Sequence, residues 1–111
     1  MAMTLKVTRG DSLPLHITVK YSDGVPYELQ EGDTLIFTVK ANVNLADNPV
    51  LIQKIMTRET GPVCELLSEE TELPYGVYKY DVELNIAASE HRFTIIKPTN
   101  FRVTTEVTTH E

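Results

Sequence analysis

Ser12 is the side chain in this sequence whose neighbours most suggest covalent chemistry, because it lies in the stretch Gly10-Asp11-Ser12-Leu13. A serine becomes a nucleophile when a histidine takes its proton, an acidic residue orients that histidine, and hydrogen-bond donors hold the oxyanion. Three histidines could act as the base: His16, His91 and His110. The spacing of acidic residues around them therefore decides whether the chain has the parts of a hydrolase.

That stretch resembles the nucleophile motif of the GDSL hydrolases, in which an aspartate stands three residues before the catalytic histidine near the C-terminus. Here Val107 stands three residues before His110, and Ala88 stands three residues before His91. The same pattern recurs as Gly32-Asp33-Thr34-Leu35 in front of an alternating apolar segment. We interpret both stretches as turns that lead into strands, with glycine for backbone freedom and Asp or Ser for side-chain capping. No catalytic residue is predicted, and we expect the protein not to be an enzyme.

Metal and cofactor chemistry has no better support in the sequence. The histidines lack a spacing that would place two of them on one face with further ligands, as zinc requires. Glu69, Glu70 and Glu72 form an acidic cluster, but without the alternating oxygen ligands of a calcium loop. Cys64, the single cysteine, is interpreted as a small apolar residue of a protein that folds in a reducing compartment. We predict no metal-binding and no cofactor-binding residue.

The charge balance and the length limit the classes of partner. Sixteen acidic against ten basic residues give a formal net charge of -6, which argues against a partner with a phosphate backbone, such as nucleic acid. No stretch reads as an export signal or approaches the roughly 18 apolar residues of a membrane span, so we expect a cytoplasmic protein with no membrane partner. At 111 residues, one domain spanning 1–111 is expected.

Alternation of apolar and polar residues is the dominant pattern of the elements that would position any site. In the stretch 13–20, Leu13, Leu15, Ile17 and Val19 fall on one face, which indicates a half-buried strand. The stretch 34–40 repeats the pattern, and 76–84 shows it most clearly. The inward residues of these two stretches are Leu35, Phe37 and Val39, and Tyr78, Tyr80, Val82 and Leu84.

Further strands are expected near the N-terminus in 4–9, at 50–56 and 63–67, and twice near the C-terminus, with Phe93 and Ile95 and then Phe101, Val103 and Val107 inward. About seven or eight short strands separated by turn residues predict an all-β protein, an antiparallel sandwich or a small barrel.

Turn chemistry separates the predicted strands. Turns are expected at Ser22-Asp23-Gly24, Glu31-Gly32-Asp33, Thr60-Gly61-Pro62 and Lys97-Pro98-Thr99-Asn100. The polar stretch 41–49 reads as a surface loop. One helical turn is expected at 68–73, with Ser68 as its N-cap.

The segment Leu73-Pro74-Tyr75-Gly76-Val77-Tyr78-Lys79-Tyr80 resembles the start of a late strand in immunoglobulin-like sandwiches. In that architecture a tyrosine corner pins the preceding loop, because its ring is buried while its hydroxyl bonds to the backbone upstream. The resemblance makes Tyr78 the corner residue. Tyr80 stands where antibody domains have their second cysteine, so the chain is not a true antibody-type domain.

A wider resemblance covers nearly the whole chain and rests on 23–29, 32–40, 73–84 and 98–108. In these segments the sequence is similar to the small β-sandwich domains of phages and prophages of Gram-positive bacteria, as in the N-terminal domain of the phage baseplate upper protein family. The resemblance implies an immunoglobulin-like β-sandwich and a non-enzymatic virion structural protein of the tail or baseplate, made in the host cytoplasm. Such a domain docks receptor-binding or fibre segments, so this chain would act alone or beside a longer partner.

Assembly through strand edges fits that implication, because unpaired backbone groups at a sheet edge can take a strand from a neighbour. The β-prone ends 1–6 and 104–111 are candidates for such pairing, in a homo-oligomer or with phage tail or baseplate proteins. The main alternative is a carbohydrate- or ligand-binding module. It predicts that Tyr21, Tyr27 and Tyr75 line one exposed strip.

Overall fold

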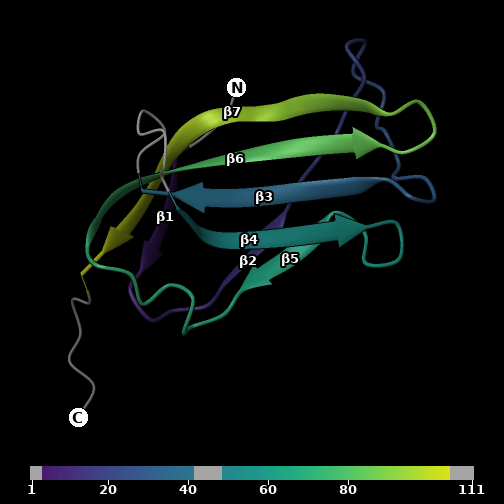
Figure 1. Cartoon of the computed structure of the whole chain (residues 1–111). Helices are drawn as coiled ribbons and strands as arrows, with labels where there is room; N and C mark the ends of the chain where they lie inside the picture. The colour runs from purple at the N-terminus through teal and green to yellow at the C-terminus, as the bar shows by residue number, and fades with distance from the viewer. Residues whose placement is uncertain (1–3, 42–48, 106–111) are drawn as a thin grey trace.

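The computed structural model describes residues 4–41 and 49–105 and contains seven strands in two sheets (Figure 1). The residues at 42–48 within the expected loop, together with Val107 and His110, lie outside the described residues. The strands are β1 (Leu5–Thr8), β2 (Leu13–His16), β3 (Thr34–Lys40), β4 (Val50–Thr57), β5 (Val63–Leu66), β6 (Gly76–Ile86) and β7 (His91–Thr104). The all-β class is confirmed.

One sheet has five strands in the order β1-β7-β6-β3-β4, and the other pairs β2 with β5. In Figure 1, the connections β2–β3, β4–β5 and β6–β7 lie together at one end of the molecule. The connections β1–β2 and β5–β6 lie at the opposite end. We call the end with the connections β2–β3, β4–β5 and β6–β7 the hairpin end, and the end with the connections β1–β2 and β5–β6 the terminal end. Side chains at one end cannot contact those at the other.

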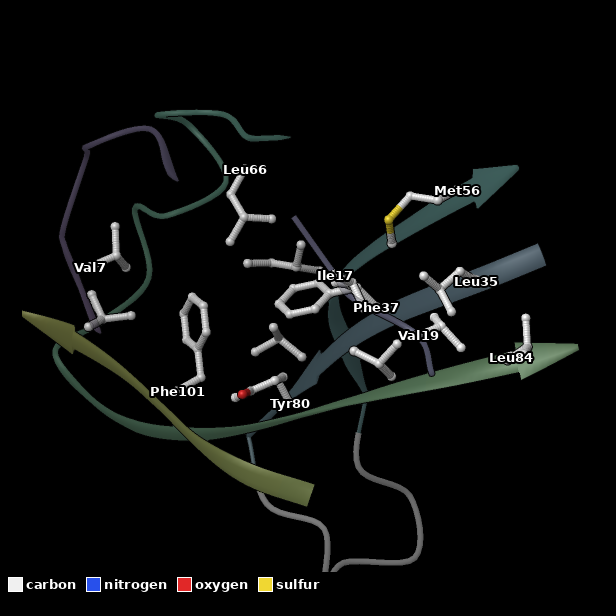
Figure 2. Packing of buried hydrophobic residues seen from close by; sticks show 14 residues of the cluster. Val7, Ile17, Val19, Leu35, Phe37, Met56, Leu66, Tyr80, Leu84 and Phe101 are labelled. Atoms are coloured by element: carbon white, nitrogen blue, oxygen red, sulfur yellow. The ribbon is translucent and has the colours of Figure 1, made fainter. Parts of the chain in front are cut away.

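The core lies between the two sheets and is built by the predicted alternation. Burial in β3 alternates residue by residue, with Leu35, Phe37 and Val39 at most 1% exposed. From the other sheet, Leu66 is fully buried, and Figure 2 shows it pointing toward the aromatic centre of the core. The ring of Phe37 packs 5.5 Å from that of Tyr80 and 6.5 Å from that of Phe101, centroid to centroid. Burial of each such side chain contributes about 1.5 to 3 kcal/mol, so these positions fix the sheets face to face.

The C-terminal part differs from the sequence prediction, because one long strand, β7, replaces two strands and a turn. Two register shifts in the β6–β7 ladder each insert one extra residue into β7. Lys97 and Pro98 together oppose Asp81, and a bulge is where a strand tolerates a residue without an N–H. The turn predicted at 97–100 is therefore wrong.

The two insertions cancel in phase, so the inward positions of β7 keep their parity. Phe101 and Val103 are buried as predicted, and Ile95 is half-buried. Phe93 stays 47% exposed, although its ladder partner Leu84 is buried. Phe93 belongs to the stretch of β7 that forms the outer edge of the sheet, so it stays exposed although it lies opposite an inward residue. The prediction that Phe93 is a buried inward residue is therefore corrected.

A second correction concerns strand direction. β1 pairs with β7 in parallel, with Leu5 opposite Phe101 and Thr8 opposite Thr104, so the fold is not purely antiparallel. The chain leaves β1 through the turn at Gly10, whose φ is +87°, and then begins the other sheet. Alternation alone cannot separate the two directions, because side chains alternate equally in parallel and antiparallel strands.

Most of the other predicted elements are confirmed. The stretch 13–20 has its apolar residues inward, although β2 itself ends at His16. In the turn at 22–24 the carboxylate of Asp23 accepts the N–H of Val25 at 3.0 Å. Residues 68–71 form a single turn, in which the N–H groups of Glu70 and Thr71 donate to the carbonyl of Leu67. Because those amides bond to Leu67 rather than to the Ser68 side chain, the N-cap prediction is wrong.

Candidate functional site

Among the described residues, Ser12, His16 and His91 do not form a catalytic group. Ser12 is exposed beside the β1–β2 turn at the terminal end, whereas His91 begins β7 at the hairpin end and packs edge-on against Phe93. His16 is exposed on β2. Within the described residues, no three His, Cys, Asp or Glu side chains gather as a metal site. Cys64 is half-buried against the core, and burial raises the pKa of its thiol.

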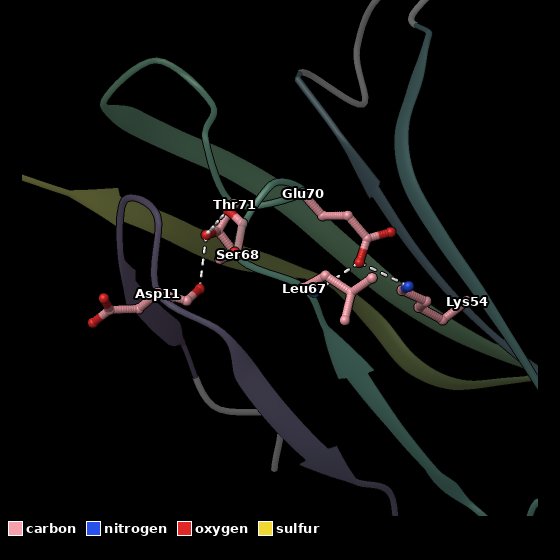
Figure 3. A network of polar contacts seen from close by, with 6 residues as sticks. All are labelled: Asp11, Lys54, Leu67, Ser68, Glu70 and Thr71. Atoms are coloured by element: carbon pink, nitrogen blue, oxygen red, sulfur yellow. Dashed lines mark hydrogen bonds and ion pairs between the residues drawn. The ribbon is translucent and has the colours of Figure 1, made fainter.

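The first Gly-Asp turn is held by a buried threonine. Thr71 is fully buried; its Oγ1 accepts the N–H of Gly10 at 3.1 Å and donates to the carbonyl of Asp11 at 2.7 Å (Figure 3). The side chain of Asp11 is exposed and takes no part. The GDSL-like stretch is therefore a structural turn anchored to the β5–β6 connection.

The second Gly-Asp turn works through its aspartate. Asp33 is 1% exposed, and its carboxylate accepts the N–H of Gln30 at 2.9 Å, the N–H of Ala87 at 3.2 Å and the hydroxyl of Tyr27. Burial by itself raises the pKa of this carboxyl, but these hydrogen bonds outweigh it and lower the pKa. Burial and the same carboxylate raise the pKa of Tyr27 to about 12. One carboxylate thus ties together two connections of the hairpin end.

One residue of the acidic cluster, Glu70, links two parts of the fold. Glu70 makes an ion pair of 2.7 Å with Lys54 of β4, and the same carboxylate oxygen accepts the N–H of Leu67 at 2.8 Å (Figure 3). Burial opposes ionisation, but the Leu67 hydrogen bond and Lys54 together lower the pKa of Glu70. Glu69 and Glu72 are exposed. The cluster therefore joins the β5–β6 connection to the edge strand β4.

The tyrosines divide between the two ends of the molecule. Tyr21 and Tyr27 form an edge-on pair with centroids 5.5 Å apart in the β2–β3 connection. Tyr75 lies in the β5–β6 connection, at the terminal end, beneath the guanidinium of Arg9 at 5.9 Å. The hydroxyl of Tyr78 donates to the carbonyl of Pro74 at 2.5 Å, so the predicted corner hydrogen bond is confirmed, with a half-buried ring. The strip that a sugar-binding face needs is not formed.

An apolar groove of about 700 Å³ lies between β2 and β7. Its floor is core, formed by Phe37, Tyr80 and Val82, and residues 15–18 and 94–97 line its two sides. Leu15, Ile17, Ile95 and Ile96 supply apolar walls, and His16 and Lys97 stand at the rim. We call this hollow the β2–β7 groove.

Within residues 4–41 and 49–105, backbone without a strand partner borders the β2–β7 groove on both sides. β1 covers the outer edge of β7 only from Phe101 to Thr104, whereas 91–100 pairs with β6 alone in the described structure. In the described part of the chain, β2 pairs only with β5. The N–H of Ile17 donates to Pro62, so by alternation His16 and Thr18 direct their backbone groups to the free side. The groove therefore joins apolar surface to two strand edges that can accept hydrogen bonds and donate them.

Sequence reasoning expected strand edges to act in assembly, but it placed them at the chain ends, of which 1–3 and 106–111 lie outside the described residues. The apolar pattern of 91–96 was visible in the sequence; its role as an open edge was not.

The described chain holds no helix that could cross a membrane. A comparison of the sequence with known protein families and with curated proteins finds no match.

Proposed function

We propose that this protein is a non-enzymatic structural module of a phage or prophage virion. It would serve as an assembly adaptor in the tail or baseplate, made in the host cytoplasm and then incorporated into the particle. Its partners are tail or baseplate proteins, with a homo-oligomer as a further possibility, and neither nucleic acid nor membrane is among them. The observation that carries the proposal is the edge of β7 beside the β2–β7 groove, which has no strand partner at 91–100 among the described residues, because such an edge can bind other chains by adding a strand.

An immunoglobulin-like arrangement of the sandwich is part of the proposal. In such sandwiches strands B and E share one sheet, and C, F and G share the other. The order found here supports the correspondence when β2 and β5 are taken as B and E, and β3, β6 and β7 as C, F and G. Tyr78 then lies at the corner position of strand F. Phe37 packs against Tyr80, where antibody domains pack a tryptophan against their disulfide.

The test is co-purification with the products of neighbouring genes, combined with sedimentation of the isolated chain. We expect a stable complex with at least one tail or baseplate protein. Ile96→Glu, which places a charge in the groove, should abolish that complex. Ile55→Glu is the matched control, because Ile55 is 56% exposed on β4. A strict monomer at high concentration that binds none of these proteins contradicts the proposal.

A ligand-binding sandwich is the second candidate, and the size of the β2–β7 groove favours it. Ligand pockets have volumes of about 300 to 1,000 Å³ and mostly apolar walls. The groove fits an apolar ligand better than a sugar, because no exposed aromatic strip is present among the described residues. Titration with fatty acids and with oligosaccharides, followed by the thermal midpoint, tests this role. A midpoint raised by a fatty acid would favour ligand binding over assembly.

A further inference from the structure

Charge is distributed very unevenly around the β2–β7 groove. Besides β3 and β6, which form its floor, the segments that border it are 5–8, 13–20 and 91–104. These three segments contain five of the ten Lys and Arg residues and none of the sixteen Asp and Glu residues. These segments therefore carry a formal charge of +5, whereas the rest of the chain carries -11. The five cations are Lys6, Lys20, Arg92, Lys97 and Arg102.

Four of these cations lie on or beside the edge of β7, where a strand added to that edge would come close to them. Lys97 lines the groove. Arg92 lies on the unpaired part of β7, with a 72% exposed side chain. Lys6 and Arg102, a ladder pair between β1 and β7, are both exposed. Among the described residues, the ion pairs of these five cations reduce to one, between Arg92 and Glu83 at 3.6 Å, so most of this charge can act on a partner.

We propose that the β2–β7 groove binds an extended segment of a partner protein in which apolar residues alternate with Asp or Glu. The segment pairs with the edge of β7 at 91–100 and so adds a strand in line with β1. Its apolar side chains enter the groove, and its acidic side chains face Arg92 and Lys97. This inference rests on the proposed assembly role and names the surface and the chemistry through which it acts.

A second copy of this chain fits the edge less well. In two β7 edges paired about a two-fold axis, residue i of one copy faces residue j of the other and j faces i, so both edges bring Arg92 and Lys97, and no acidic residue of 91–100, to the pair. Like charges across a strand pair are destabilising. A basic edge on a chain that is acidic elsewhere therefore selects a different, acidic strand.

The experiment uses the full chain and three capped eight-residue peptides. The first alternates valine with glutamate, the second has lysine in place of glutamate, and the third repeats the first with N-methyl groups along both edges. Fluorescence anisotropy measures affinity, and amide hydrogen exchange locates the bound peptide. We expect the glutamate peptide to protect amides within 91–100 and to bind at least about tenfold more tightly than the lysine peptide at low salt. The N-methylated peptide should not bind, because it cannot complete a ladder.

Charge reversals at two sites distinguish the effect of a charge at the rim of the groove from the effect of the protein's overall charge. Lys97→Glu should weaken binding of the glutamate peptide by about three- to tenfold. Arg58→Glu is the control, because it makes the same change of charge at an exposed site in the β4–β5 connection. Both residues are exposed, so both variants should fold. Equal weakening by the two variants would overturn the placement of the acidic strand at the rim.

Other outcomes distinguish a failure of the proposed strand site from a failure of the proposed assembly function. Protection of 91–100 by self-association of the wild type, without peptide, would make a second copy the occupant and overturn the proposal. If no peptide binds but a tail protein still co-purifies, the strand site is wrong and assembly uses another surface. If the glutamate peptide binds at 91–100 and no tail protein does, the groove assignment stands and the proposed function fails.

Discussion

Replacing Asp33 by alanine should destabilise this fold more than any other change to a single charged residue in a turn. Asp33 is 1% exposed and accepts hydrogen bonds from Gln30, Ala87 and Tyr27. A hydrogen bond to a charged group contributes about 1.5 to 3 kcal/mol, and a buried donor left without a partner costs about 1 to 3 kcal/mol. The total is smaller than three times these values, because the hydroxyl of the half-buried Tyr27 can turn to solvent when the carboxylate is removed. We therefore expect a loss of about 3 to 5 kcal/mol, a large part of the roughly 5 to 15 kcal/mol of a typical domain.

Asp11→Ala is the matched control, since Asp11 occupies the same position in the first Gly-Asp turn. Its side chain is exposed, and only its backbone carbonyl bonds to Thr71. The expected change is within about 0.5 kcal/mol. Tyr27→Phe removes one of the three donors and should cost about 1 to 2 kcal/mol.

Urea unfolding followed by circular dichroism measures the free energy of unfolding for all three variants, at a pH where Asp33 is ionised. The m-value should stay constant, because the surface exposed on unfolding does not change. A loss below about 1 kcal/mol for Asp33→Ala, or an equal loss for Asp11→Ala, would refute the argument that the buried carboxylate holds the hairpin end.

Three further predictions concern the same framework. Tyr78→Phe removes the hydroxyl that bonds to Pro74 and should lower stability by about 1 to 3 kcal/mol, whereas Tyr75→Phe should not; equal denaturation midpoints for wild type and Tyr78→Phe would falsify the corner. Gly32→Ala should cost about 2 kcal/mol or more, because φ is +87° and the new Cβ would lie 2.9 Å from that of Ala87; in an Ala87→Gly background the clash disappears and the loss should shrink, so an unchanged loss would contradict the clash. The folded-state pKa values of Asp33 and Glu70 are lowered from 3.8 and 4.5, so their stabilisation is complete above those values and is lost as pH falls through the folded values. Urea midpoints should therefore drop below about pH 4, and the deficit of Asp33→Ala should narrow there; a constant deficit would argue against the lowered pKa.

The strands, their inward residues and most turns were predictable from the sequence because they depend on local pattern. Alternation in 34–40 and 76–84 reports which side chains face the core, and this holds whatever strand lies alongside. A hydrogen bond from the Tyr78 hydroxyl to the backbone upstream was predictable from the resemblance to a tyrosine corner, and the structure gives its partner as the carbonyl of Pro74, four residues before it.

Pro98 shows where local pattern gives the wrong answer. A proline beside polar residues normally marks a turn, yet here β6 holds the chain extended through two bulges. The same limit applies to the two Gly-Asp turns. They are nearly identical in sequence, but Asp33 is buried among three donors, whereas Asp11 is exposed and its turn is held by Thr71, 60 residues away.

The sequence by itself determined the all-β class, the core faces and the net acidic charge, because each follows from residue type and short-range spacing. Only the tertiary structure decided that β1 pairs in parallel with the end of β7, and that 91–100, among the described residues, is an edge beside an apolar groove. It also decided that half of the cations lie on the segments that flank that groove, with Lys97 lining it. The physical reason is that strand order and edge exposure depend on contacts between segments about 80 to 100 residues apart, as in Leu5 with Phe101, and the period-two pattern of a strand carries no record of its neighbour.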